Sequence, residues 1–587
     1  MLRTHHCAEL SKADIGKTVT LCGWVDARRD HGGLLFIDLR DRWGKTQMVF
    51  DPTKAKAVHD AANKLRSEYV ISVTGQVAAR PQGTVNKKIP TGEIELIVSE
   101  LKLLSESETP PFEILDQMEV SEEIRLRYRF LDIRRHTMMN RLLTRSKITT
   151  TVRQYLDGQQ FAEIETPYLT KSTPEGARDF LVPSRLTPGT FYALPQSPQL
   201  FKQMLMVSGV DRYFQIARCF RDEDLRADRQ LEHTQIDIEM SFITEEDIHT
   251  LIEGMMAVIF RDVMDQSLNT PFQRLTYADA MNQYGSDKPD LRFGLPLKEL
   301  TEIFRVTQFK VFQANIASGG VVKGLKVGGK IFSRKELDDF TQVAKDFGAK
   351  GLVWLKVKSI ASSELESPIA KFLSPDEIKG LIKALELKDG DTAFLVSDEW
   401  ETTCVVLGEL RCRLAKELKL INHESFCFLW IVDFPLLEWN PDEKRWQAKH
   451  HPFTSPKEAD MTSLRDKPAQ ARARAYDLVL NGTEIGGGSI RIHSQKVQQE
   501  MFKVLGISDE EVQSRFGFFL RALQYGAPPH GGIALGLDRL TAMLLRLESI
   551  REVIAFPKTQ KGTCLLSEAP SSVADKQLKE LHIRIKT

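Results

Sequence analysis

The sequence has few cysteines for its length, and none of them is spaced like a metal ligand. Its 587 residues include seven Cys, an odd number, and no Cys-x-x-Cys pair. Structural zinc sites usually contain such pairs, and disulfide frameworks usually hold an even number of cysteines in a short chain. The pattern therefore argues against zinc and against disulfides, and we expect reduced thiols in a cytoplasmic protein.

Long hydrophobic runs are also missing. No stretch reaches the length of a transmembrane helix, and the start, Met1-Leu-Arg-Thr-His-His6, does not resemble a secretory signal. We therefore expect a cytoplasmic protein without a membrane partner. Hydrophobic residues make up 42% of the chain and charged residues 27%, which is ordinary for a globular protein large enough to hold several domains.

Net charge is absent as well, because 80 Lys and Arg balance 80 Asp and Glu. A balanced total gives no indication of nucleic-acid binding, but it can hide a local excess. Residues 1–105 contain 16 Lys and Arg against 12 Asp and Glu, a formal charge of +4. A nucleic-acid partner for this part of the chain therefore stays open.

The common glycine-rich nucleotide motifs are not found either. Residues 528–545 have the pattern of a glycine-rich strand that runs into a helix, with Arg539 in the first helical turn. Neither Gly-Lys-Ser/Thr nor Gly-x-Gly-x-x-Gly occurs there. A helix N-terminus favours an anion, but this turn alone is weak evidence for a site.

The most informative stretch that is present runs from 213 to 242 and has the pattern strand, charged loop, strand. In the second strand Ile236, Ile238, Met240 and Phe242 alternate with Gln235, Asp237, Glu239 and Ser241, as in a strand with one apolar face. The first strand alternates less cleanly. A solvated hairpin with surface ion pairs is the simpler explanation, but polar residues continue along a face that neighbouring elements should cover. We therefore predict a site for a polyanion that carries an amine or a metal.

The first hundred residues predict a β-barrel. Candidate strands are 18–25, 33–39, 46–50, 69–77 and 93–101, with a helix at 54–66. Five strands with a helix after the third is the order of an oligonucleotide-binding (OB) fold. Its nucleic-acid face would contain Arg28, Arg29, His31, Phe36, Arg40 and Gln47. Phe36 alone could be a core residue, but arginine, an aromatic ring and glutamine together are typical of single-strand binding.

The middle of the chain gives weaker signals. Residues 105–125 have the composition of a linker, and 125–135 pack many arginines around apolar residues, which predicts either a surface helix or a hinge that touches RNA. Residues 286–424 alternate strands (320–327, 351–357, 392–397) with helices (335–347, 374–385). We expect an inserted α+β domain that either contributes to the shape of the protein or contacts RNA.

A tight hairpin is predicted at 476–485, with Asn481-Gly482 as its turn. This turn pairs residue 479 with 484, so Asp477 and Glu484 become diagonal neighbours on one face and could share Mg²⁺. The following Gly486-Gly-Gly488 interrupts the strand alternation, so the side on which Arg491 lies stays open.

Taken together, these stretches closely resemble the bacterial aspartyl-tRNA synthetases, which are class II enzymes. Residues 161–167, 220–237 and 531–540 resemble motifs 1, 2 and 3 of that class. Residues 176–185, 196–202, 220–230 and 484–493 match the bacterial aspartyl pattern more specifically. The resemblance covers essentially the whole chain, including the Ile-Ala-Phe-Pro-Lys at 554–558.

The resemblance implies a multidomain α+β protein with a six-stranded antiparallel class II sheet flanked by helices. It implies a homodimer formed partly by motif 1 around Pro167. The implied domains are an OB-fold anticodon-binding barrel (1–105), a linker and hinge (106–140), the first part of the catalytic domain (141–285), an inserted α+β domain (286–424), the second catalytic part (425–555) and a C-terminal extension (556–587).

The resemblance also implies the reaction. Aspartate attacks the α-phosphate of ATP, and the aspartyl group then passes to the 3′ end of tRNA. Because the substrate carboxylate is the nucleophile, no enzyme nucleophile is needed, and catalysis rests on positioning and electrostatics. The partners would be L-aspartate, ATP with Mg²⁺, and tRNA.

The resemblance implies residues for catalysis, for aspartate, for ATP with Mg²⁺ and for the anticodon. Arg221 and Arg539 would be catalytic, and aspartate would meet Glu175, Gln199, Lys202, Arg221, Asp237, His450 and Arg491. ATP would meet Arg221, Asp222, Glu223, Gln230, His233, Glu484, Gly536, Leu537, Asp538 and Arg539, with Mg²⁺ on Asp477 and Glu484. The anticodon would meet Arg29, Phe36 and Gln47.

One position departs from the family pattern. Relatives usually have Pro-Glu-Phe where this chain has Leu231-Glu232-His233, and the aromatic ring there stacks on adenine. Imidazole offers less area for stacking. The chain should therefore bind ATP somewhat more weakly without losing activity.

The tRNA specificity depends on His31 and Gly83. In this family His and Gly at these places occur in relaxed enzymes that charge both tRNA(Asp) and tRNA(Asn), whereas strict enzymes tend to have Leu and Lys. We therefore expect an aspartate–tRNA(Asp/Asn) ligase. The alternatives are a strictly tRNA(Asp)-specific enzyme, an asparaginyl- or lysyl-tRNA synthetase, and a non-catalytic tRNA-binding paralogue. Lys202 with Arg491 favours an acidic substrate.

Overall fold

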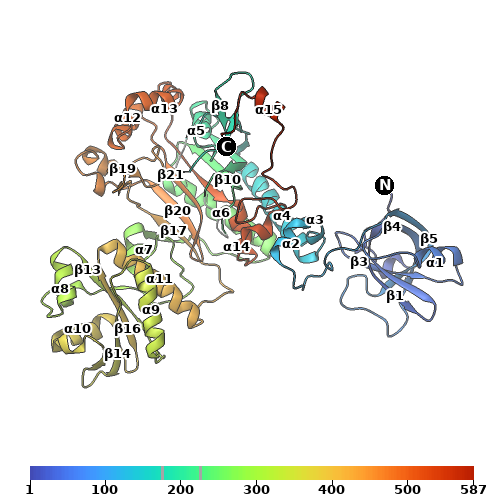
Figure 1. Ribbon diagram of the computed structural model, residues 1–587, viewed down its shortest axis with the longest axis horizontal. Helices are drawn as coiled ribbons and strands as arrows, with labels where there is room; N and C mark the ends of the chain where they lie inside the picture. The colour runs from blue at the N-terminus through green and yellow to red at the C-terminus, as the bar shows by residue number, and fades with distance from the viewer. Residues whose placement is uncertain (174–176, 224–227, 587) are drawn as a thin grey trace. The chain divides into compact units, whose positions relative to one another are not determined.

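The computed structural model describes residues 1–173, 177–223 and 228–586. The chain divides into two compact units (Figure 1). The first contains residues 1–144 and 551–571, and the second contains 145–550 and 572–587. Within the described ranges, no helix combines the length and apolar character needed to cross a membrane.

The first unit begins with the predicted barrel. Its elements are β1 (Thr18–His31), β2 (Leu34–Arg40), β3 (Lys45–Phe50), α1 (Lys56–Ala62), β4 (Val70–Ala79) and β5 (Ile94–Ser105). The strands close in the order β1-β2-β3-β5-β4. Alternate residues such as Val19, Leu21 and Ile37 fill the interior. The OB-fold prediction is therefore confirmed, because period-two alternation with turns between the strands specifies such a barrel.

The linker holds α2 (Glu122–Arg127) and α3 (Arg129–Asp132) and is built around the buried Arg129. Its guanidinium pairs with Asp132 at 2.5 Å. It also donates to the backbone carbonyls of Arg551, Ile554 and Ala555 at 2.9–3.0 Å. A buried cation needs this full set of partners. Arg129 thereby joins the linker to a segment that lies more than four hundred residues later in the chain.

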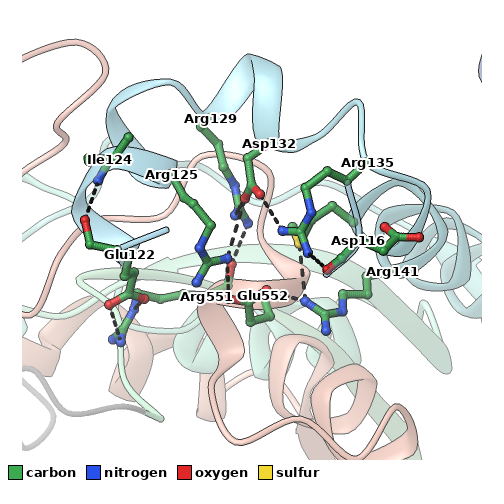
Figure 2. Close-up of polar contacts among 12 residues, drawn as sticks. Asp116, Glu122, Ile124, Arg125, Arg129, Asp132, Arg135, Arg141, Arg551 and Glu552 are labelled. Carbon is green, nitrogen blue, oxygen red and sulfur yellow. Dashed lines mark hydrogen bonds and ion pairs between the residues drawn. The ribbon is translucent and has the colours of Figure 1, made fainter. Parts of the chain in front are cut away.

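Other arginines of the linker are also paired within the first unit. Arg135 binds Asp132 at 2.6 Å, and Glu552 accepts from both Arg125, at 3.1 Å, and Arg141 (Figure 2). These guanidinium groups are committed to the chain's own carboxylates. An RNA contact through the linker would have to compete with those ion pairs, which weakens the hinge-to-RNA prediction.

The second unit is organised on an eight-stranded sheet in the order β11-β17-β20-β21-β22-β10-β9-β6. The six inner strands pair antiparallel, as the resemblance implied, and one parallel strand is added at each edge. The bounds are β6 (Ala162–Glu163), β9 (Arg212–Phe220), β10 (Glu232–Ser241), β11 (Gln273–Thr276), β17 (Phe428–Val432), β20 (Ala475–Leu480), β21 (Thr483–Ile490) and β22 (His530–Gly536).

Helices α4 (His136–Gly158), α6 (Glu245–Met264) and α14 (Leu537–Leu544) pack on the sheet (Figure 1). Ile148, Val152 and Leu156, whose i, i+4 spacing predicts one face of a helix, are fully buried in this core. Two details of the prediction were wrong. Residues 161–166 predict a short strand that ends before Pro167, but β6 is only two residues long. Phe242 is 76% exposed, because β10 ends at Ser241 and Phe242 takes a left-handed φ of 59° that breaks the alternation.

The inserted region folds on a five-stranded sheet in the order β12-β13-β16-β14-β15, with a hydrophobic cluster on each face. Its elements are β12 (Lys298–Glu299), α8 (Lys310–Ala317), β13 (Val321–Val327), α9 (Arg334–Asp346), β14 (Val353–Ser359), β15 (Glu364–Glu366), α10 (Pro375–Leu385), β16 (Thr392–Asp398) and α11 (Trp400–Glu417). The predicted strands and helices lie within two residues of β13, β14, β16, α9 and α10. Helices α8 and α11 were not predicted.

The remaining elements complete the second unit around the main sheet. They are β7 (Leu181–Pro183), β8 (Phe191–Ala193), α5 (Gln199–Val207), α7 (Tyr277–Tyr284), β18 (Leu437–Asn440), β19 (Arg445–Ala448), α12 (Gln495–Val504), α13 (Asp509–Leu523) and α15 (Asp575–Glu580). Of these, α5 borders the site described next.

Candidate active site

A cavity of about 530 Å³ lies over the centre of the main sheet. Strands β10, β20, β21 and β22, helices α5 and α14, and the residues that follow β9 from Arg221 supply its walls. The lining includes most of the residues implied to bind aspartate or ATP: Gln199, Lys202, Arg221, Glu223, Gln230, His233, Asp237, His450, Asp477, Glu484, Arg491, Gly536, Asp538 and Arg539. Residues more than three hundred positions apart are thus brought together in one concave surface.

One end of the cavity is a buried lattice of alternating charges. Lys202 of α5 lies 2.7 Å from Asp237 and 3.4 Å from Glu239. Arg491 forks onto both oxygens of Glu239 at 2.9 and 3.0 Å. The side chains of all four are at most 2% exposed. Buried charges persist only when they are paired and hydrogen-bonded, so this lattice fixes two cations in place before any ligand binds.

Two adjacent histidines border this lattice. Arg491 donates to Nε2 of His451 at 2.7 Å, and burial together with Arg491 holds the pKa of His451 well below its usual range. His451 is therefore neutral and acts as an acceptor for the guanidinium. His450 packs edge-on against Phe434 at 4.7 Å and lies 3.6 Å from Asp477.

Several polar atoms that face the cavity have no hydrogen-bond partner within the described chain. They are Nε2 of Gln199, Nε of Arg221, Oδ2 of Asp237 and Nδ1 of His450, and all four are buried. An unpaired buried polar atom is costly. An unpaired acceptor could accept a hydrogen bond from an ammonium group of a ligand, and unpaired donors could donate to its acidic oxygens. The cavity therefore suits a ligand that has both kinds of group.

The other end of the cavity holds two carboxylates on the β20–β21 hairpin. Val479 pairs with Glu484, as the two-residue turn predicted, and a bulge follows at Leu478. Gly487 lies between the two acids: a Cβ added there would stand 2.6 Å from Asp477 and 3.5 Å from Glu484. The charge of Asp477 and burial raise the pKa of Glu484 to about 7.

This acid pair fits a divalent cation. Two close carboxylates in a buried place repel each other, and hard oxygen ligands are those that Mg²⁺ prefers. The pair supplies only two protein ligands. In the described residues, no cluster of three or more His, Cys, Asp or Glu has the arrangement of a metal site. Such a partial ligand set is usual for Mg²⁺ that arrives with a nucleotide.

Arg539 and the loop after β9 line the same end. Arg539 donates to the carbonyl of Glu484 at 2.7 Å and pairs with Asp228 at 3.3 Å. Glu223 pairs with Arg229 at 2.5 Å. His233 is mostly buried, and burial with Arg221 nearby lowers its pKa to about 3. A neutral imidazole ring is therefore presented where adenine stacking was expected.

Some expected residues take other positions. The carboxylate of Asp538 accepts from the backbone N–H of Thr234 and pairs with Arg145, so it braces α14 against β10. Leu537 is buried in the core, which leaves only its backbone for a ligand. Asp222 does not line the cavity. Glu175 lies outside the described residues.

The expected anticodon residues lie on one face of the barrel. Arg29 is opposite Phe36, and Asp38 is opposite Gln47. Arg29 pairs with Asp38 at 2.8 Å, and Gln47 donates to Glu95 at 3.0 Å.

The two expected discrimination residues are also placed. The ring of His31 meets the ring of Phe36 edge-on at 6.2 Å, at the end of β1. Gly83 occupies a turn after β4 with φ of 88°, a value that favours glycine.

The sequence analysis did not assign roles to Glu239, His451 and Ser489. All three contact Arg491. The alternation of β10 had already put Glu239 beside Asp237 on the polar face. A second buried carboxylate needs a second cation as its partner. The alternation in the sequence could therefore have predicted that Glu239 pairs with a cation.

Comparisons with known proteins agree with this arrangement. The OB-fold nucleic acid binding domain matches residues 19–104, and tRNA synthetases class II (D, K and N) match residues 121–560. The aspartate–tRNA(Asp/Asn) ligase of Caldanaerobacter subterraneus subsp. tengcongensis is 56% identical over 584 residues, covering 99% of this chain and 98% of the relative. That of Geotalea uraniireducens is 56% identical over 583 residues, with the same coverage.

Among solved structures, the asparaginyl-tRNA synthetase from Pyrococcus horikoshii complexed with asparaginyl-adenylate has a similar fold. The TM-score is 0.60 at 18% identity, over 95% of this chain and 99% of that chain. At this identity the likeness concerns the fold alone. The family match covers well over half of the chain, and the curated relatives match it end to end. The chain therefore belongs to the class II tRNA synthetases of the D, K and N group.

Proposed function

We propose that the protein is an aspartate–tRNA ligase that charges both tRNA(Asp) and tRNA(Asn). The observation that supports this best is the buried lattice with its unpaired polar atoms. Lys202 and Arg491 are held as fixed cations, and Oδ2 of Asp237 is a free acceptor. This arrangement suits an amino acid that has an α-ammonium group and a side-chain carboxylate.

The lattice also explains rejection of asparagine. A neutral amide would leave the buried cations with poorer partners, which costs binding energy because charged groups lose more than neutral ones when unpaired. Gln199 and His450 complete the wall around the bound aspartate, and Glu175 is expected to do so as well.

In the first reaction the aspartate carboxylate attacks the α-phosphate of ATP and pyrophosphate leaves. Arg221 holds the carboxylate and the α-phosphate together, and Glu223 and Gln230 hold the nucleotide. Arg539 binds the γ-phosphate end. Asp477 and Glu484 would hold Mg²⁺, which neutralises phosphate charge when it is bound. The chain contributes position and fixed charge rather than a nucleophile.

In the second reaction the tRNA 3′ hydroxyl takes the aspartyl group. We propose that Arg29, Phe36 and Gln47 contact the anticodon, and that His31 with Gly83 permits tRNA(Asn). Relatives at 56% identity that bear the name aspartate–tRNA(Asp/Asn) ligase support this assignment.

Two further proposals concern assembly and location. We propose a homodimer through the region of Pro167, since the next two residues, Tyr168 and Leu169, are exposed and apolar. Sedimentation analysis would test it, and a monomer at micromolar concentration would contradict it. We also propose a cytoplasmic location, where tRNA and ATP are available.

Aspartate-dependent exchange between ATP and pyrophosphate tests the activation step. No exchange in well-folded protein would favour a non-catalytic tRNA-binding protein, and exchange with asparagine or lysine instead would indicate a different specificity. Charging of both tRNA transcripts by the purified protein then tests the tRNA range. If tRNA(Asn) is not charged, the enzyme is strictly specific for tRNA(Asp).

A further inference from the structure

The inserted domain begins with a segment that reaches the cavity. Residues 286–292, called the entry segment here, follow α7 directly. Asp287 of this segment lines the cavity. Its neighbour Lys288 pairs with Asp287 at 3.0 Å. Neither residue has a role in the reaction as described above.

The entry segment is held rigidly from within the inserted domain. Arg411 of α11 is buried and donates to the carbonyls of Asp290 and Phe293 at 2.8 and 3.0 Å. The same guanidinium lies over the ring of Phe293 at 4.1 Å. Arg292 closes the segment on itself by forking onto the carboxylate of Asp290 at 2.7–3.2 Å. A buried guanidinium with this many partners fixes backbone position.

The start of the segment is fixed as well. Gly285 ends α7 with a left-handed φ of 68°. A Cβ added to it would stand 2.1 Å from the carbonyl oxygen of Cys404 and 2.6 Å from the nitrogen of Gly408. Helix α11 therefore contacts the backbone just before the segment, and only glycine fits this approach.

The segment also contacts the hairpin that holds the acid pair. A Cβ added to Gly482, in the turn between β20 and β21, would stand 3.0 Å from the Cβ of Asp290. Asp477 and Glu484 are on the two strands of this hairpin. The inserted domain thus holds the entry segment at a set position relative to the acid pair.

The charges at this end of the cavity are complementary to a polyphosphate with its cation. The acid pair would hold the metal, and Arg539 lies on one side of it. Lys288 supplies a second cation, whose side chain is 51% exposed and, among the described residues, forms an ion pair with Asp287, which is 37% exposed. An ammonium group on a flexible stem can exchange a carboxylate partner for a phosphate at little cost.

We propose that Lys288 binds the β- and γ-phosphates of ATP, and hence the departing pyrophosphate, and that the inserted domain serves to hold the entry segment at this place. In the ligand-free protein Asp287 keeps Lys288 near the cavity. When ATP binds, the lysine transfers to the phosphates. This proposal rests on the assignment of the cavity as the ATP site.

The experiment compares Lys288→Met with Lys358→Met. Lys358 is a matched control because it is a lysine of the same domain, 52% exposed against 51% for Lys288, that also pairs with surface carboxylates. The measurements are the KM for ATP and for pyrophosphate in aspartate-dependent exchange, and the Kd of a non-hydrolysable aspartyl-adenylate analogue. The analogue lacks the β- and γ-phosphates, so it does not reach Lys288.

We expect Lys288→Met to raise the KM for ATP and for pyrophosphate by roughly tenfold or more, the usual effect of losing a charge-assisted hydrogen bond. The Kd of the analogue should stay unchanged, Lys288→Arg should restore most of the effect, and Lys358→Met should behave like the wild type.

Two results would overturn the proposal: unchanged KM values in Lys288→Met, or an equal loss of affinity for ATP and for the analogue, which would indicate a structural role. Failure of the underlying assignment looks different. In that case the wild-type protein itself would show no aspartate-dependent exchange.

Discussion

The end of the cavity proposed for aspartate and the barrel face proposed for the anticodon both pair an arginine with a carboxylate, but in opposite surroundings. The side chains of Arg491 and Glu239 are at most 2% exposed, whereas the side chain of Arg29, which pairs with Asp38, is 46% exposed. Breaking a buried pair costs about 3–5 kcal/mol, and an exposed pair is worth about 0.2–1 kcal/mol. In the proposed function, amino-acid choice is thus enforced by buried charge. Choice of tRNA would depend on weaker contacts that water can replace, so it would be easier to relax.

The largest effect is expected from Arg491→Leu, which tests the buried half of this comparison. Glu239 would lose its main partner, and the site would lose one of its two fixed cations. We expect kcat/KM for aspartate in pyrophosphate exchange to fall roughly 10²- to 10³-fold, the equivalent of about 3–5 kcal/mol. Arg472→Leu, which removes an exposed pair with Asp460, is the control. Similar kinetics in the two variants would show that burial does not matter here.

A second test concerns buried charge that lacks a compensating partner. Because the folded state raises the pKa of Glu484 from 4.5 to about 7, it binds a proton more tightly than the unfolded chain does. Stability of the ligand-free protein should therefore fall as the pH rises from about 4.5 through about 7. Glu484→Gln removes this loss. We expect its Tm to exceed that of the wild type by about one to three degrees at pH 8, at about 1 °C per kcal/mol for a unit of more than four hundred residues, and to match it near pH 4.

Thermal unfolding at a series of pH values measures this difference. Mg²⁺ should raise the Tm of the wild type at pH 8 more than that of the variant. Glu438→Gln, on an exposed pair with Lys449, should show no pH-dependent difference. A constant Tm offset for Glu484→Gln across the pH range would contradict the charge-repulsion explanation.

A smaller effect is expected from Phe36→Ala on the barrel face. Loss of one base–aromatic stack costs about 1–3 kcal/mol, so kcat/KM for tRNA(Asp) should fall roughly 5- to 100-fold. Pyrophosphate exchange needs no tRNA and should be unchanged. Phe347→Ala, an exposed phenylalanine of the inserted domain, is the control. A parallel loss of exchange would mean that the variant is damaged in its fold rather than in anticodon binding.

His31→Leu should change selectivity more than activity. A single net hydrogen bond is worth about 0.5–1.5 kcal/mol, so we expect charging of tRNA(Asn) to drop by about tenfold or less while charging of tRNA(Asp) stays close to wild type. The measurement is kcat/KM on the two transcripts, with His5→Leu, a partly exposed residue of the barrel region, as control. An equal drop in kcat/KM for both transcripts would show that His31 does not discriminate between the two tRNAs.

The smallest effect is expected from His233→Phe. Because the pKa of His233 is lowered to about 3, the imidazole is neutral at physiological pH, so the substitution changes ring area rather than charge. The larger ring should gain about 0.5–1.5 kcal/mol of stacking and lower the KM for ATP roughly two- to tenfold. An unchanged or higher KM for ATP would show that the residue does not stack on adenine.

Strict alternation made most of the fold predictable from sequence. The barrel strands, the register of Val479 with Glu484, and the polar face of β10 all follow from period two and from one Asn-Gly turn. The prediction failed where that period is interrupted. Because Gly486-Gly-Gly488 interrupts the alternation, the sequence does not predict the side of the strand on which Arg491 lies. Phe242 lies beyond the end of its strand because it has a left-handed φ.

Long-range pairing could not be predicted for a different reason. Nothing local relates Lys202 to Asp237 or Arg411 to Asp290, because such contacts depend on tertiary packing rather than on spacing along the chain. The roles of the site residues came from the family resemblance, and the geometry of the cavity is compatible with them without testing each one.

The contacts of Arg129 have a consequence for protein synthesis. Its hydrogen bond to the carbonyl of Arg551 joins residues 422 positions apart. The barrel can fold as soon as its own strands have left the ribosome, since domains generally fold as units during synthesis. The linker behind it cannot bury Arg129 until nearly the whole chain has been translated. During synthesis, the folded barrel is therefore followed by a linker that cannot complete its fold until residue 551 has been translated.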